Sequence, residues 1–223
     1  MARAVLSGSR RYETWKTLDA FNAFRAECSL RLARVEPILK KHRLKLAVEN
    51  HKDLRSVELA GLMREFKSGW LGLNVDTGNN LALLEDPYET VEALAPFALS
   101  AHLKDMAIKP HAHGFLLSEV NCGQGFLDLP RIAAFLRKAN PRVCFNLEMA
   151  TRDPLLVPCL DDGYFATFPE RQATHLAPAM ARVLEHPPKQ PPPTVAGHPM
   201  TKQLADEEAN NRVCLEWMHH RLT

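Results

Sequence analysis

Four strand-like apolar runs in this sequence each end on a side chain that can bind a metal ion. The runs are LKLAVENH, WLGLNVDTGN, ALSAHLKD and RVCFNLEMA, and the side chains are Glu49, Asp76, His102 and Glu148. Helix-length segments separate the runs, as in a parallel barrel, where the C-terminal ends of the strands carry the chemistry. Three carboxylates and one imidazole suit Mn²⁺, Mg²⁺, Zn²⁺ or Fe²⁺ better than an ion that prefers thiolates. The sequence therefore predicts that these four side chains converge on one divalent ion.

Each of the four residues also has an ordinary structural interpretation. A glutamate at a strand end can face solvent or pair with a helix N-terminus, and Asp76 in VDTGN can cap its own turn. His102 can be a buried histidine with common hydrogen bonds. As a metal ligand, its second ring nitrogen would need a partner, for which Asp105 is the candidate. It is the occurrence of all four residues, in order, that favours the metal site.

Four further polar side chains near these strand ends are predicted to contact a substrate. They are His51, Asn79, Lys104 and Arg152. His51 would donate to a substrate oxygen or lie exposed, and Asn79 would bind hydroxyl groups or serve a turn. Lys104 would stabilise an anionic intermediate or lie at the surface. Arg152 would bind a phosphate or carboxylate of a ligand, or form a salt bridge within the protein.

The composition excludes several classes of protein. The net charge of +2, from 28 basic and 26 acidic residues among 223, gives no electrostatic footprint for nucleic acid or an anionic membrane. The five cysteines are scattered and form no CxxC pair, which argues against a disulfide framework or a structural zinc site. No apolar run is long enough to span a bilayer, and no secretory signal opens the chain. We expect a cytoplasmic enzyme.

The alternation of apolar strands with helices predicts a parallel α/β fold. A complete (β/α)₈ TIM barrel has eight such units in about 250 residues, whereas about six units are visible here, so an incomplete barrel is expected. The expected strands are at 2–8, 45–49, 70–76, 98–103, 115–120 and 142–149.

The predicted organisation has four parts. Residues 1–160 form the partial barrel, and 161–185 form a C-terminal helical segment with its helix near 169–185. The proline-rich stretch at 186–200 is predicted to be an extended linker. The amphipathic helix at 201–223 has apolar residues that suggest docking on the main body or on a partner.

Five short motifs resemble the xylose isomerase-like TIM-barrel superfamily of sugar (phosphate) isomerases and epimerases, which also contains inosose dehydratase-like proteins. The resemblance covers about residues 2–160, with the first two βα units of the family lacking a counterpart. Its motifs are ENH at 49–51, DTGN at 76–79, HLKD at 102–105, GQG at 123–125 and NLEMATRDPL at 146–155.

The resemblance implies that Glu49, Asp76, His102 and Glu148 hold one divalent metal. Mn²⁺ or Mg²⁺ is expected first, with Zn²⁺, Co²⁺ and Fe²⁺ as alternatives. It also implies that the two glutamates act as acid and base on opposite faces of a small sugar, keto-sugar or polyol, which isomerises or epimerises through an enediolate.

Two other functions stay open at this point. One is a dehydratase on the same scaffold, and the other is a truncated, non-catalytic remnant. In each case we expect no nucleic-acid or membrane partner. An open barrel edge would favour a homo-oligomer, because unpaired strand edges invite association.

Overall fold

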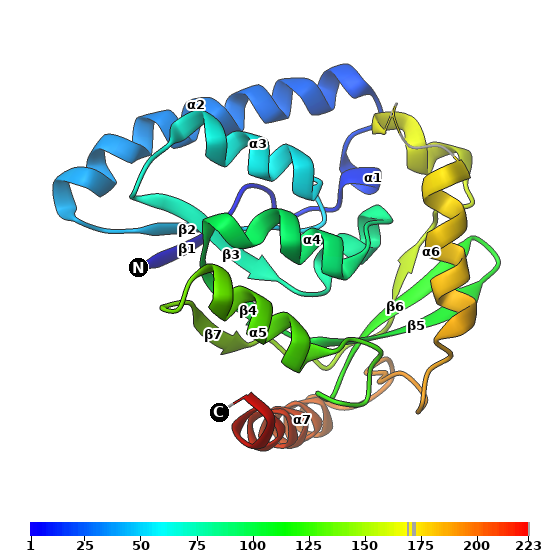
Figure 1. Cartoon of the computed structure of the whole chain (residues 1–223). Helices are drawn as coiled ribbons and strands as arrows, with labels where there is room; N and C mark the ends of the chain where they lie inside the picture. The colour runs from blue at the N-terminus through cyan, green and yellow to red at the C-terminus, as the bar shows by residue number, and fades with distance from the viewer. Residues whose placement is uncertain (169, 171–172, 223) are drawn as a thin grey trace.

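The computed structural model describes residues 1–168, 170 and 173–222. A five-stranded parallel sheet lies at its centre and curves as part of a barrel wall (Figure 1). Every neighbouring pair of its strands is parallel. In sheet order the strands are β1 (Ala2–Val5), β2 (Leu46–Glu49), β3 (Leu71–Asp76), β4 (Ala98–Leu103) and β7 (Cys144–Leu147).

Helices cover the outer face of this sheet (Figure 1). The strand side chains that face them are fully buried and apolar, including Val48, Leu73, Val75 and Leu103. The covering elements are α2 (Leu18–His42), α3 (Ser56–Phe66), η1 (Asn79–Leu83), α4 (Pro87–Leu94), η2 (Ala95–Phe97) and α5 (Leu129–Ala139). Burial of these apolar strand residues against the helices fixes which faces of the strands point into the barrel.

The expected strand at 115–120 is present, but it belongs to a second sheet. This sheet consists of β5 (Asp105–His111), β6 (Gly114–Val120) and β8 (Leu155–Val157), all paired antiparallel. The connection from His111 to Gly114 allows only a hairpin, because a parallel connection needs about a dozen residues or more. The parallel sheet therefore has five strands, where the sequence had suggested six.

Asp105 fastens the glycine turn to the start of this hairpin. Its carboxylate accepts hydrogen bonds from the backbone N–H groups of Gly123 and Gly125, both at 2.9 Å, and of Leu127 at 3.2 Å. A Cβ atom on Gly125 would lie 2.0 Å from Asp105 Oδ1, so the turn requires glycine at this position. The turn and the hairpin are thereby held against the end of β4.

The C-terminal part of the chain packs on the main body. It comprises η3 (Asp162–Thr167), α6 (Ala173–Glu185) and α7 (Met200–Leu222), with α1 (Arg11–Thr14) packed against η3. Of the helix expected near 169–185, residues 169, 171 and 172 lie outside the described residues. Helix α7 contacts α5 and β7 and buries Cys214 and Leu222. Among the described residues, no helix combines the length and apolar character needed to cross a membrane.

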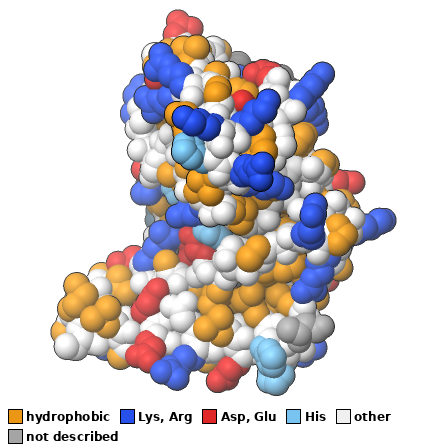
Figure 2. Space-filling model, turned by 90° about the vertical axis from the view of Figure 1, so that its left-hand side faces the viewer, with side chains coloured by type: hydrophobic (Ala, Val, Ile, Leu, Met, Phe, Trp, Pro, Cys, Tyr) orange, Lys and Arg blue, Asp and Glu red, His pale blue; other side chains and the backbone are white. Residues whose placement is uncertain are grey.

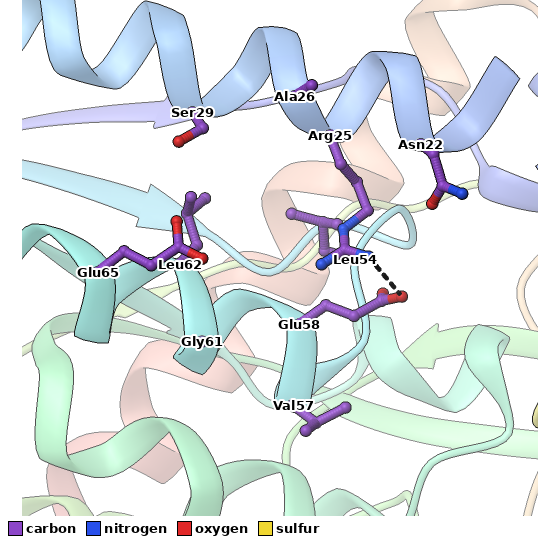
Figure 3. A pocket seen from close by; sticks show the side chains of 10 residues that line it. All are labelled: Asn22, Arg25, Ala26, Ser29, Leu54, Val57, Glu58, Gly61, Leu62 and Glu65. Atoms are coloured by element: carbon purple, nitrogen blue, oxygen red, sulfur yellow. Dashed lines mark ion pairs between the residues drawn. The ribbon is translucent and has the colours of Figure 1, made fainter. Parts of the chain in front are cut away.

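Helices α2 and α3 leave a hollow of about 360 Å³ between them (Figure 3). Arg25 of α2 points across it toward Glu58 of α3, with the two charged groups 4.0 Å apart. The hollow lies in the helical layer, and its lining includes none of the four predicted metal ligands.

The loop after β2 contains a buried carboxylate that should make stability depend on pH. Burial raises the pKa of Asp53 to about 7, although the backbone N–H groups of Leu54 and Ser7 donate to it. Because this pKa lies above the ordinary value of about 3.9, the contribution of Asp53 to stability is present below pH 4 and is lost as the pH rises through 7.

We therefore expect Asp53→Asn to gain stability relative to the wild type between pH 4 and pH 8. The gain is at most about 4 kcal/mol, since one pKa unit corresponds to about 1.4 kcal/mol. Urea unfolding of both proteins at several pH values measures it, with the exposed Asp162→Asn as control. A difference that does not change with pH would contradict the expectation.

Candidate metal centre

The four predicted ligands lie together at one end of the parallel sheet. Glu49 is the last residue of β2, Asp76 the last of β3, and Glu148 directly follows β7, while His102 is next to last in β4. Each side chain offers one ligand atom, and these atoms all lie within 4.8 Å of one another. The parallel register explains this convergence, because Asp76 pairs with His102 across β3 and β4.

The centre is closed on one side and accessible on the other. The Asp76 side chain is fully buried, whereas 32% of the Glu148 side chain is exposed. Glu49 is as deeply buried as Asp76, and His102 is intermediate. A ligand can therefore approach these residues from the side of Glu148.

Asp76 uses its two oxygens differently. Oδ1 accepts from the backbone N–H groups of Gly78 at 2.9 Å and Asn79 at 2.7 Å, so the residue does cap its own turn. Oδ2 is buried and has no hydrogen-bond partner, although Lys104 Nζ lies 2.9 Å away. Oδ2 is therefore the ion-pair partner of Lys104, and a divalent ion bound at the centre would compete with this ammonium for it.

The predicted partner of His102 is wrong. Asp105 is fully occupied by the glycine turn, and Glu148 Oε2 instead lies 2.5 Å from His102 Nδ1. Glu49 Oε2 lies 3.3 Å from the same nitrogen. The strand ends direct these side chains toward one another, whereas Asp105 begins β5 and its carboxylate meets the GQG turn.

The mutual contacts shift the pKa values of these groups. Burial opposes protonation of His102, but Glu148 and Glu49 outweigh it, so the pKa of the imidazole is raised. Burial likewise opposes ionisation of Glu148, but His102 and Lys104 hold the pKa of this carboxyl well below its usual range. Burial raises the pKa of Asp76 to about 7, despite the nearby Lys104. Glu148 is thus a carboxylate at neutral pH.

Lys104 is a buried cation beside the predicted ligands, which excludes the surface position left open by the sequence. Its Nζ atom lies 2.9 Å from Asp76, 3.3 Å from Glu119 and 3.4 Å from Glu148. Burial lowers the pKa of this amine, but the surrounding carboxylates outweigh burial and raise it above its ordinary value. Lys104 therefore remains charged.

Glu119 is a part of this site that the sequence did not reveal. It projects from β6, where it is buried and accepts from the backbone N–H of Ala150 at 2.7 Å. It also forms ion pairs with Lys104 and Arg152. The only signal in the sequence was a charged residue within the apolar strand GFLLSEV. The sequence predicts that the strand at 115–120 belongs to the barrel wall, and this placement gives no reason to expect Glu119 at the metal centre.

The structure joins three of the four predicted substrate-binding residues into one network. Asn79 Oδ1 accepts hydrogen bonds from Lys104 at 3.4 Å and from Lys52, a second residue that the sequence did not single out. Arg152 joins through Glu119, with 54% of its side chain exposed. His51 differs, because its Nδ1 atom is buried without a hydrogen-bond partner, and burial lowers the pKa of the ring.

A third residue missed from the sequence, Arg3, comes from the outer strand β1. Its guanidinium lies 2.5 Å from Glu49 Oε2, and Asn74 Nδ2 donates to the same oxygen at 3.2 Å. Arg3 and Asn74 thus hold one oxygen of Glu49 in place.

Two relatives are similar to this chain over less than half of its length. One is the 3-oxo-isoapionate decarboxylase of Pectobacterium atrosepticum, 28% identical over 105 residues, which is 46% of this chain and 38% of the relative. The other is the uncharacterised protein YihM of Escherichia coli, 30% identical over 99 residues, which is 44% of this chain and 30% of the relative. The matched region thus spans well under half the length of either relative.

The fold is also similar to that of a solved structure. A xylose isomerase-like TIM-barrel protein from Mycobacterium smegmatis, in complex with magnesium, superposes with a TM-score of 0.52 at 17% sequence identity. The match covers 71% of this chain and 52% of that protein. The sequence profile of one family, described as "Xylose isomerase-like TIM barrel", matches residues 4–178. This chain belongs to the xylose isomerase-like TIM-barrel family.

Proposed function

We propose that the chain contributes the metal centre of a divalent-metal-dependent enzyme that isomerises or epimerises a small sugar or keto-sugar. The convergence of Glu49, Asp76, His102 and Glu148 within 4.8 Å is the observation that carries the proposal. The donor set fits a hard or borderline divalent ion, Mn²⁺ or Mg²⁺ first, with Zn²⁺, Co²⁺ and Fe²⁺ as alternatives. The burial of the Asp76 carboxylate among the other predicted ligands supports this fit.

The bound ion would polarise the carbonyl group of the substrate and favour loss of a proton from the neighbouring carbon. In the proposed reaction, Glu148 takes that proton, because it is the most exposed of the three carboxylates at the centre. The electron pair of the broken C–H bond moves onto the carbonyl oxygen and gives an enediolate. The Lys104 ammonium would stabilise this negative charge.

Glu49 is the proposed partner of Glu148 in the second proton transfer. The two glutamates come from strands β2 and β7, with β3 and β4 between them, so they reach the centre from separate parts of the sheet. Returning the proton to the neighbouring carbon gives an isomer, and returning it to the opposite face gives an epimer. Asn79 and Arg152 are the proposed contacts to substrate oxygens, together with His51.

Exchange of substrate hydrogen with solvent tests this proposal. We expect the Mg²⁺- or Mn²⁺-loaded protein to introduce deuterium from D₂O next to the carbonyl of one member of a panel of neutral and acidic keto-sugars. Glu148→Gln should slow this exchange by roughly 10²–10⁴-fold, the usual contribution of a general base. Mass spectrometry of the recovered sugars gives the readout. A folded, metal-loaded protein that exchanges no hydrogen would contradict the proposal.

A lyase is the second candidate, because one relative is named a decarboxylase. In this alternative, the same anionic intermediate is formed with loss of carbon dioxide, or loses a β-hydroxyl group as in a dehydratase. Mass spectrometry of the product separates these outcomes from isomerisation. If calorimetry shows no binding of divalent metal, the non-catalytic remnant replaces both enzyme proposals.

The outer strand β1 supports the further proposal that two copies of the chain associate. Within the described residues, β1 pairs with β2 alone, and Val5 is 37% exposed. Figure 2 views the molecule from this side and shows hydrophobic side chains gathered in its lower half, with Lys and Arg above. We expect a concentration-dependent dimer in analytical ultracentrifugation, weakened by the edge charge of Val5→Lys. A monomer at every concentration would refute association.

A further inference from the structure

Lys52 is a buried ammonium group whose contact partner, among the described residues, is a neutral amide. The residue is 7% exposed and lies in the loop after β2. Its Nζ atom donates to Asn79 Oδ1, which belongs to a neutral amide. Within the part of the chain that the structure describes, no carboxylate lies within ion-pair distance of this nitrogen. Buried lysines ordinarily have a charged partner, so this arrangement needs an explanation.

The backbone holds Lys52 in this position under strain. Its φ angle of +44° lies in the left-handed region, which a side-chain-bearing residue seldom adopts. The carbonyl oxygen of the residue accepts from the backbone N–H of Arg11 at 2.9 Å, which fixes the peptide. A strained backbone that places a buried cation against a neutral amide, without a carboxylate in contact, is typical of a functional position.

Lys52 also lies beside a second cation. Asn79 Oδ1 accepts from both Lys52 and Lys104, so a single amide oxygen separates the two ammonium groups. Burial lowers the pKa of Lys52 to about 8, and Lys104 adds to this effect. An anion that entered next to Lys52 would relieve both the lack of a partner and the repulsion.

The charges around the metal centre indicate how much negative charge a ligand should bring. The contact network holds four carboxylates, Glu49, Asp76, Glu119 and Glu148, and four cations, Arg3, Lys52, Lys104 and Arg152. A divalent ion would leave this balanced set with two surplus positive charges. A substrate carboxylate would offset one of these charges, and transfer of the substrate proton to Glu148 leaves the total charge unchanged.

We propose that Lys52 binds the carboxylate of an anionic sugar substrate, so that the enzyme acts on sugar acids. This inference rests on the proposed function, and it names the substrate class of the same site. In this arrangement Lys52 forms an ion pair with the substrate carboxylate, and the predicted metal ligands lie next to the carbon atoms that react. Asn79 accepts a hydrogen bond from the Lys52 amine and so holds it in place. Because this partner is a neutral amide, binding of the substrate carboxylate breaks no ion pair of Lys52.

Titration of the Lys52 amine in the presence of small probes tests this inference. Lysine side-chain NMR on the full chain follows each amine, and the Lys52 signal is assigned by its loss in Lys52→Met. We expect acetate to raise the pKa of Lys52 by about one unit or more, as an opposite charge within contact distance does. Acetamide has the same shape without the charge, and it should leave this pKa unchanged. The exposed Lys109 serves as the internal control.

Three outcomes would overturn the inference. They are an unchanged Lys52 pKa at saturating acetate, an equal effect of acetamide, or a larger effect of inorganic phosphate, which would replace the carboxylate by a phosphate. Lys52→Gln provides the assignment if Lys52→Met does not fold. Running the titration with and without Mg²⁺ separates the two proposals. An acetate effect without any Mg²⁺ binding would refute the metal enzyme and leave the carboxylate site standing.

Discussion

Replacing Asp76 with asparagine should weaken binding of Mg²⁺ or Mn²⁺ by more than about 100-fold. Loss of a residue that merely supports a ligand typically lowers metal affinity by 10–100-fold. Asp76 is proposed to contribute the oxygen itself, because its buried carboxylate lies among the other predicted ligand atoms. Asparagine keeps an oxygen for the N–H groups of Gly78 and Asn79, so the turn should survive. The substitution thus removes charge from the centre with little change of shape.

Isothermal titration calorimetry measures this effect directly. The matched control is Glu65→Gln, which neutralises an exposed carboxylate on α3 and should leave metal affinity unchanged. Circular dichroism would establish that Asp76→Asn folds. Equal metal affinities of Asp76→Asn and the wild type would contradict the assignment of the four residues as ligands.

Replacing Arg11 with methionine should lower the free energy of unfolding by about 3–5 kcal/mol, the range measured when one partner of a buried ion pair is removed. The Arg11 guanidinium lies 2.7 Å from Glu58 Oε2, and both side chains are buried. It also lies over the rings of Phe21, at 3.5 Å, and Phe168, at 4.0 Å. Arg11 therefore ties the segment near η3 to α2 and α3, and its loss leaves the buried Glu58 carboxylate with only its longer ion pairs, to Arg55 at 3.4 Å and to Arg25 at 4.0 Å.

Urea unfolding, monitored by tryptophan fluorescence, gives the measurement. Arg31→Met is the control, because the pair of Arg31 and Glu27 is exposed and typically contributes 0–1 kcal/mol. The double variant of Arg11→Met with Glu58→Leu should regain part of the loss, because the Glu58 charge is then absent, while the Arg55 backbone N–H loses its acceptor. A loss in Arg11→Met no larger than that in Arg31→Met would show that the buried pair contributes little.

The strand ends could be predicted from the sequence because the apolar pattern of a buried strand is complete within a few residues. An apolar run with a charged residue at its end specifies both the strand and the direction of that side chain, which is why Glu49, Asp76 and Glu148 were found to converge. Their role as ligands stays a prediction. The superfamily and the α/β barrel class are confirmed.

Contacts made across the fold could not be read in the same way. Glu119 reaches the site only because β5 and β6 form a hairpin outside the parallel sheet. Lys52 follows a strand in a polar loop, a position in which lysine is ordinarily exposed. Arg3 depends on the pairing of β1 with β2. Each of these placements follows from which segments become neighbours in space, and the local pattern of residues carries no information about that.

The confinement of all four predicted ligands to residues 49–148 has an evolutionary consequence. One contiguous stretch of gene encodes them, together with Lys52, Lys104 and Glu119. Recombination at its borders could exchange the surrounding walls without disturbing the donor geometry. Descendants of such an exchange would inherit the same chemistry and the same Lys52, and would differ in the contacts to the rest of the substrate.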